Sequence, residues 1–252
     1  MSDFNRNPAV RGYGADRAVA IDAGLRAYMI RVYNYMAGGV ALTGVFAWLT
    51  FNMAVVQNAS GQITGLTSLG QTLFGSPLMW VVMLAPLAMV FFLSFRIGHI
   101  QASTARTLFF VYAAMVGVSL ATIFMVYTAT SVTRVFFISA AAFGALSLYG
   151  YTTQRDLSPI GSFLIMGLFG LLIAMVVNIF LKSSGLDFVI SAVGVLVFAG
   201  LTAYDTQNIK EMYDPMDDGT VGGRKAVMGA LKLYLDFINL FLMLLRLLGD
   251  RR

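Results

Sequence analysis

Two aspartates, Asp205 and Asp236, stand in stretches that are otherwise rich in apolar and aromatic residues. The first lies in Ala203-Tyr204-Asp205-Thr206-Gln207, and the second in Leu233-Tyr234-Leu235-Asp236-Phe237-Ile238-Asn239-Leu240-Phe241. A carboxylate at membrane depth is costly to insert, so its presence indicates a functional site by default. Because the two stretches are consecutive and antiparallel in our reading, we interpret the aspartates as a coupled pair.

The chemistry of such a pair is that of a proton and cation site. Two carboxylates that lie close together in a low dielectric cannot both ionise cheaply, so they share a proton at low pH. At higher pH both ionise, repel each other and attract a cation. The two predicted helices are joined by the loop 209–225 and run in opposite directions from it. Asp205 and Asp236 therefore lie in the same half of the membrane, at depths that differ by up to about 10 Å. Helix tilt can bring them level. We predict a pH sensor and gate in a cation pathway.

Several polar neighbours are candidates to support this pair. Arg96 ends an apolar stretch on the same side of the membrane and is a candidate partner for Asp205, which would make it a latch. Lys232 is one helical turn before Asp236, so a local Lys232–Asp236 ion pair is an alternative role for that aspartate. Three further side chains could donate hydrogen bonds or could simply pack and anchor their helices: Tyr204, Tyr234 and Asn239.

The composition defines the class of protein. The chain is 58% hydrophobic and 12% charged, whereas soluble domains are about 45–50% apolar and about 25% charged. This predicts an all-α polytopic membrane protein, and the length suits one helical bundle. The chain has no cysteine, which excludes disulfides and thiolate catalysis. The net charge of +5 comes from basic residues that flank apolar stretches, so it indicates membrane orientation and not nucleic-acid binding.

Seven stretches are long enough to span a hydrocarbon core of about 30 Å. We expect residues 1–27 to form a polar, largely flexible cytoplasmic tail, with a short helix from Ala15 as an alternative, and residues 28–250 to form the transmembrane domain. The predicted spans are about 30–54, 77–97, 107–128, 132–152, 160–181, 188–208 and 226–248.

The distribution of Lys and Arg predicts the orientation. Basic residues lie in the N-terminal tail and in alternate loops, which places the N-terminus in the cytoplasm of a multi-pass inner-membrane protein. Seven spans then put the C-terminus outside, although Arg251 and Arg252 count against this. A re-entrant last segment would return the tail to the inside. We favour seven full spans.

The loop 209–225 is acidic, with Glu211, Asp214, Asp217 and Asp218 among glycines. A flexible turn is the simpler interpretation, because the spacing of the carboxylates differs from that of a helix–loop–helix calcium site.

Enzyme signatures are weak. Serine and zinc proteases of the membrane need a histidine in the bundle, and the one histidine, His99, falls in a predicted loop. An intramembrane aspartyl protease would match Tyr204-Asp205, but Asp236 lacks the glycines of the second motif that such proteases carry. We therefore expect no enzyme and no cofactor.

The chain resembles the Bax inhibitor family, also called the transmembrane Bax inhibitor motif family. The resemblance covers about residues 28–250 and rests on the two aspartate motifs together with Arg31-Val32-Tyr33-Asn34-Tyr35-Met36 and Ala41-Leu42-Thr43-Gly44. It implies a seven-helix bundle whose last helix is central and wrapped by the other six. It also implies a pH-sensitive calcium leak with the aspartate pair at Asp205 and Asp236, and a latch at Arg96.

One departure from the family concerns the ion path. Some bacterial relatives carry a membrane glutamate about three turns before the arginine, where this chain has Ala85-Pro86. The ion path of this chain therefore has one carboxylate fewer.

Our leading hypothesis is a cation leak, with Ca²⁺ as the main candidate ion. Its partners are the bilayer, Ca²⁺ and H⁺. Two alternatives stay open: a non-transporting regulator that binds a membrane protease or other membrane proteins, and proton-coupled transport of a small solute.

Overall fold

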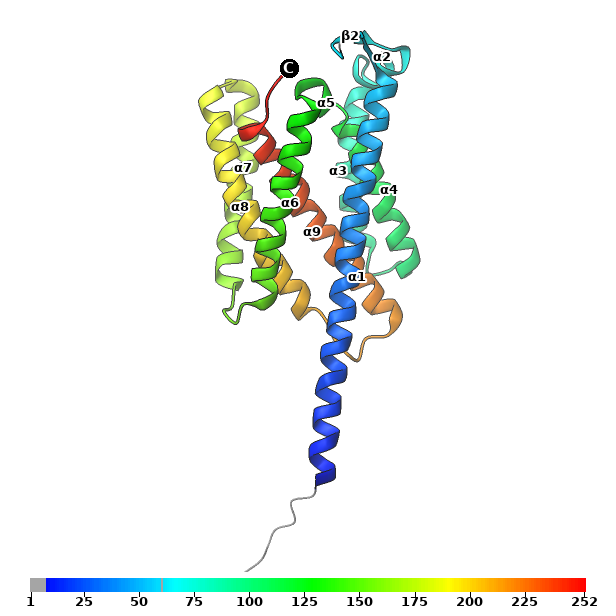
Figure 1. The fold of residues 1–252 in the computed structure, drawn as a ribbon, viewed down its shortest axis with the longest axis vertical. Coiled ribbons are helices and arrows are strands. Elements are labelled where there is room, and N and C mark those ends of the chain that lie inside the picture. The colour runs from blue at the N-terminus through cyan, green and yellow to red at the C-terminus, as the bar shows by residue number, and fades with distance from the viewer. Residues whose placement is uncertain (1–7, 60) are drawn as a thin grey trace, which may run out of the picture.

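The computed structural model describes residues 8–59 and 61–252, which fold into an elongated helical bundle (Figure 1). Within these residues seven helices are long and apolar enough to cross a membrane, which confirms the predicted seven-helix architecture. They are α1 (Pro8–Ala54), α3 (Leu78–Arg96), α4 (Ala102–Leu120), α6 (Ala129–Thr152), α7 (Ser158–Leu181), α8 (Ser184–Glu211) and α9 (Gly219–Leu248).

Two boundaries differ from the prediction. Helix α1 begins at Pro8 and runs without a break into the first span, so the largely flexible tail is wrong for residues 8–27 and the helical alternative is nearer. The part of that prediction that concerns residues 1–7 lies outside the described residues. The third span divides into α4 and a short helix α5 (Ile123–Val126). At the break, Thr122 Oγ1 donates to Ser119 O, and hydroxyls of this kind compete with helical backbone bonds.

The uncharged segment after α1 contains structure that the sequence analysis did not predict. It forms an antiparallel hairpin of β1 (Val55–Gln57) and β2 (Ile63–Leu66), followed by α2 (Ser68–Phe74). Gly61 in the turn has φ +75°, a conformation that glycine adopts without strain. The hairpin and α2 lie at one end of the bundle next to α1, and α2 leads the chain into α3 (Figure 1).

Helix α9 is the most enclosed of the spanning helices. Two thirds (67%) of its most apolar stretch is buried, against 6% for α3 and for α7. It packs against α1, α4, α6 and α8, and Figure 1 shows it between α6 and α1. The main contacts of α3 are with α4 and α2, and those of α7 are with α8. That all six other spans wrap α9 therefore stays a prediction for α3 and α7.

Helix α9 also extends along the whole bundle. Its 30 residues are about 45 Å long at 1.5 Å per residue, enough to cross a bilayer completely. Figure 1 shows the C-terminus at the end of the molecule opposite to the start of α1. The structure therefore favours a full seventh span over the re-entrant alternative.

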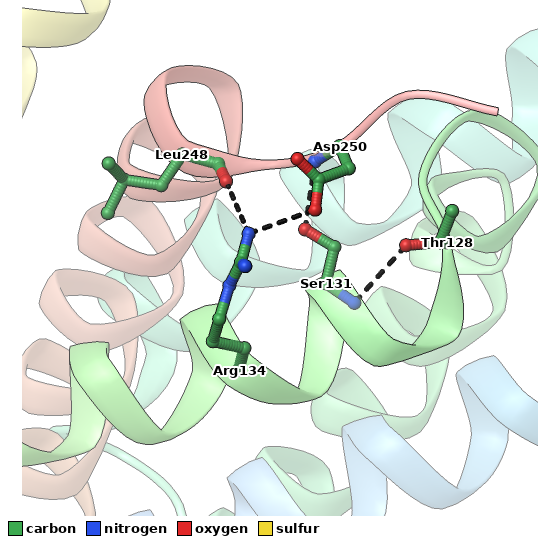
Figure 2. Close-up of polar contacts among 5 residues, drawn as sticks. All are labelled: Thr128, Ser131, Arg134, Leu248 and Asp250. Carbon is green, nitrogen blue, oxygen red and sulfur yellow. Dashed lines mark hydrogen bonds and ion pairs between the residues drawn. The ribbon is translucent and has the colours of Figure 1, made fainter.

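The residues after α9 are bound to the start of α6, and we call residues 249–252 the C-terminal clasp (Figure 2). Arg134 Nη2 donates to Leu248 O at 3.1 Å and to Asp250 Oδ2 at 3.0 Å. The backbone N–H of Asp250 donates to Ser131 Oγ at 2.9 Å, and that of Thr128 donates to Asp250 O at 3.1 Å.

The last residue extends the clasp towards the hairpin. Arg252 donates to Val126 O from its backbone at 2.9 Å, and to Tyr127 O and Gly61 O from its guanidinium. Its guanidinium also lies 5.8 Å from the centroid of the Phe51 ring. A basic residue that counted against the predicted orientation thus has local structural contacts at this end.

Candidate functional site

The site lies where α8 and α9 pack together. The two helices come close together at Gly229 of α9. A side chain there would collide with α8, because an added Cβ would lie 2.9 Å from Ile209 Cγ2. The two helices bring the carboxyl groups of Asp205 and Asp236 close enough to interact directly. Asp236 is 5% exposed, and the side chain of Asp205 is 16% exposed.

A hydrogen bond between the two carboxyl groups would require a proton. An ionised carboxylate has only acceptor oxygens, so one of the two groups would have to carry a proton to donate to the other. Among the described residues, no hydrogen-bond donor reaches the buried Asp236 Oδ2. The arrangement is therefore compatible with a pair of carboxyl groups that shares one proton.

A lysine supplies the counter-charge. Lys232 Nζ lies 3.6 Å from Asp205 Oδ1 and donates to Asn208 Oδ1 at 3.1 Å. The ion pair that forms is thus between α9 and α8, in place of the local Lys232–Asp236 pair that was left open above. With one proton on the aspartates and a charged lysine, the cluster is neutral overall, which limits the cost of burying it.

Arg96 is not part of this cluster. It is exposed at the end of α3, and no ion pair among residues 8–59 and 61–252 includes it within 4.0 Å. In this arrangement the basic partner of Asp205 is Lys232. The sequence did contain a signal for this, because Lys232 shares a helical face with Asp236.

Tyr234 points away from the aspartates. Its buried hydroxyl lies 2.7 Å from Thr43 Oγ1, which donates to Ala113 O at 2.8 Å. Two residues along an α-helix are separated by about 200°, so Tyr234 faces α1 and α4 while Asp236 faces α8. Tyr234 therefore has the packing role that the sequence analysis kept as its alternative to a hydrogen bond with the pair.

Tyr204 and Asn239 also make other contacts. The ring of Tyr204 covers Gly161 of α7, where an added Cβ would lie 2.4 Å from Tyr204 Cε2. Asn239 Nδ2 donates to Leu235 O at 2.8 Å within its own helix. Both residues therefore have the packing role that the sequence analysis kept as their alternative.

Hydroxyl groups of α1, α6 and α8 form a chain that the sequence analysis did not identify. Ser147 Oγ of α6 lies 2.9 Å from Thr206 Oγ1 and 2.6 Å from the hydroxyl of Tyr33 in α1. This chain links α8 to α6 and α1. Its members are far apart in sequence, so only packing brings them together.

The last residue of the first aspartate motif secures the loop between α6 and α7. Gln207 Nε2 donates to Arg155 O at 2.8 Å, and its Oε1 accepts from Leu157 N–H at 2.8 Å. In the same loop the Ser158 backbone N–H, helped by the Ser158 hydroxyl, holds the pKa of Asp156 below its usual value.

The acidic loop between α8 and α9 is shorter than predicted and its aspartates have structural partners. Asp218 accepts from the N–H groups of Thr220 and Val221 and so caps α9. Asp217 forms an ion pair of 2.6 Å with Lys225. Across the described residues, no group of three or more His, Cys, Asp or Glu is gathered to hold a metal ion.

The two buried carboxyl groups alone cannot complete a calcium site. Ca²⁺ takes about 6–8 oxygen ligands, so an ion at Asp205 and Asp236 would keep water or backbone ligands for most of its shell. The pair therefore suits transient contact with a passing cation better than a resident one.

Comparisons with known proteins identify relatives along nearly the whole chain. A family described as "Inhibitor of apoptosis-promoting Bax1" matches residues 25–252. A protein of Rickettsia prowazekii is 48% identical over 92% of this chain and 92% of its own length. The inner membrane protein YbhL of Escherichia coli K12 is 44% identical over 94% of this chain and 97% of its own. A protein of Caulobacter vibrioides is 43% identical over all of both chains.

Proposed function

Because the chain belongs to the Bax inhibitor-1 family of membrane proteins, we propose that it is a pH-sensitive leak for cations, with Ca²⁺ the main permeant ion. Asp205 and Asp236 are the sensor and the gate, and Lys232 is their counter-charge. The observation that carries this proposal is the close approach of two carboxyl groups on neighbouring helices, one of them almost completely buried.

Loss of the shared proton supplies the force that opens the gate. While the proton is present, it ties α8 to α9 through the two side chains. Once it leaves, two unit charges about 4 Å apart repel by about 4 kcal/mol at an effective dielectric of 20. That is larger than the net contribution of about 0.5–1.5 kcal/mol from a typical hydrogen bond. Either the helices separate or a cation enters to compensate the charge.

The packing of α9 explains how a local change could open a path. Helix α9 contacts α1, α4 and α6 as well as α8, so a shift of α9 alters several interfaces at once. Arg96 lies at the end of α3, and the following loop is already tied to α9, since Arg224 donates to Gly98 O. In the proposal Arg96 replaces Lys232 as the partner of Asp205 in a second arrangement.

We place the N-terminus in the cytoplasm and the protein in the inner membrane. The basic residues at the α1 end support this orientation, and the relative YbhL is an inner membrane protein. The C-terminal clasp then lies on the outer side.

The test is calcium influx into proteoliposomes between pH 6 and 8. Wild type should carry more Ca²⁺ at the higher pH, and Asp205→Asn and Asp236→Asn should each remove the pH dependence, because each replaces a carboxyl group that exchanges the proton. Asp187→Asn is the matched control. This aspartate is 39% exposed and pairs with Arg246, at 3.7 Å, away from the site.

The result that contradicts the proposal is a wild type that passes no more Ca²⁺ than empty liposomes at every pH. That outcome favours the regulator, which should then crosslink to a membrane protease or another membrane protein in cells. Saturable uptake of a small solute without Ca²⁺ flux favours proton-coupled transport.

A further inference from the structure

Two hollows lie between α1 and α6, on the side where Figure 1 shows α9 between these helices. The first is a cavity of about 340 Å³ with α9 as its floor. Its walls are apolar and largely aromatic, and they include Val40, Phe136, Phe137, Phe237 and Phe241. It is open next to Gly44, where an added Cβ would meet no atom within 4 Å.

The second hollow, of about 500 Å³, lies nearer the start of α1 and differs in character. Arg26 lines it together with Tyr33, Ser147 and Tyr151. Among the described residues around this hollow, Arg26 is the charged one and none is acidic. Arg26 is exposed, and it takes part in no ion pair within the described part of the chain.

The two hollows follow one another along the same pair of helices, and we call them together the α1–α6 groove. The apolar hollow begins at Val40 of α1 and continues to Ala47. The distance from Arg26 to Val40 is 14 residues, or about 21 Å at 1.5 Å per residue. One leaflet with its headgroups measures about the same, since a whole bilayer is about 40–45 Å thick. The groove thus has a basic, hydroxyl-lined end at headgroup level and an apolar end near the middle of the membrane.

We propose that the α1–α6 groove binds one anionic phospholipid of the leaflet at the α1 end. Arg26 recognises the headgroup charge, and an acyl chain fills the apolar hollow over α9. The polarity of the groove matches that of such a lipid at both ends, and the distance from Arg26 to the start of the apolar hollow is about the thickness of one leaflet. The chain end would contact Phe237 and Ile238, which directly follow Asp236 on α9. The lipid site does not depend on whether the protein conducts ions.

The headgroup half of the proposal is tested by native mass spectrometry of the purified full chain with phosphatidylglycerol and phosphatidylcholine. Wild type should retain one phosphatidylglycerol in preference to phosphatidylcholine. Arg26→Gln should lower that preference about fivefold, the factor expected for one basic side chain at an anionic membrane surface. Arg106→Gln, which removes an exposed charge from the start of α4 outside the groove, should leave it unchanged. Equal retention of both lipids by wild type, or equal effects of the two variants, overturns the headgroup assignment.

The acyl-chain half is tested by filling the apolar hollow. Gly44→Phe places a ring in open space, so the protein should fold and lose the retained lipid. Gly170→Phe is the matched control, because an added Cβ on α7 also meets nothing within 4 Å but lies outside the groove. If Gly44→Phe does not fold, Gly144→Phe fills the other hollow, again from open space. Lipid retention equal to wild type in a folded groove variant overturns the site.

Discussion

Replacing Lys232 by Met tests how the aspartate pair is balanced. The lysine stabilises the ionised state of the pair, so its removal should favour the protonated, closed state and shift opening to higher pH. At 3.6 Å from Asp205 and a dielectric of 20, the Coulomb energy is about 4.6 kcal/mol. Since the side chain of Lys232 is 36% exposed, solvent screening should reduce this to about 1–2 kcal/mol.

One pH unit corresponds to about 1.4 kcal/mol, so the midpoint of calcium flux against pH should rise by about one unit in Lys232→Met. The assay is the proteoliposome influx described above, extended to pH 9. Lys210→Met is the control, because Lys210 Nζ is near the same end but donates to Tyr151 O at 3.0 Å and does not contact the pair. A midpoint that falls, or that moves equally in both variants, would refute the assigned role of Lys232.

Three predictions concern stability and are measured by thermal unfolding in detergent. Gly229→Val should lower the free energy of unfolding by about 1–3 kcal/mol, because the new side chain would collide with Ile209 and separate α8 from α9. An unchanged melting temperature would show that the helices are less tightly packed. Gln207→Leu should lower the free energy of unfolding by about 1–3 kcal/mol, because two backbone groups of the α6–α7 loop would lose their hydrogen-bond partner. An unchanged stability would mean that water replaces the amide. Asp250→Asn should lower the free energy of unfolding by less than about 1 kcal/mol, because the side chains of Asp250 and its partner Arg134 are 67% and 55% exposed. A larger loss would show that the C-terminal clasp depends on this charge.

The seven spans could be predicted from the sequence because each is a long apolar run between polar or glycine-rich segments. The aspartate pair could be proposed for the same reason, since two carboxylates stand out in such runs. Their contact could not be deduced. It depends on the close packing of α8 and α9 at Gly229 and Ile209, which no local pattern reveals.

The differences at the site have a common physical cause. Tyr204 and Tyr234 are near the aspartates in sequence, which suggests hydrogen bonds to them. Neighbours on a helix point in different directions, however, so both side chains contact other helices. Lys232 was correctly placed on the face of Asp236, but its partner, Asp205, comes from another helix. The hairpin and the C-terminal clasp pair segments far apart in the chain through backbone groups, which leave little trace in residue types.

The most direct test of the account follows the proton itself. Infrared spectroscopy of the protein in membranes detects the stretching band of a protonated carboxyl group, and the band can be recorded across the same pH range as calcium influx. If a shared proton forms the gate, the band should disappear with the same midpoint at which influx rises, and it should be altered in Asp236→Asn. Influx that changes with pH while the band stays constant, or a band unaffected by Asp236→Asn, would contradict a gate formed by the shared proton of Asp205 and Asp236.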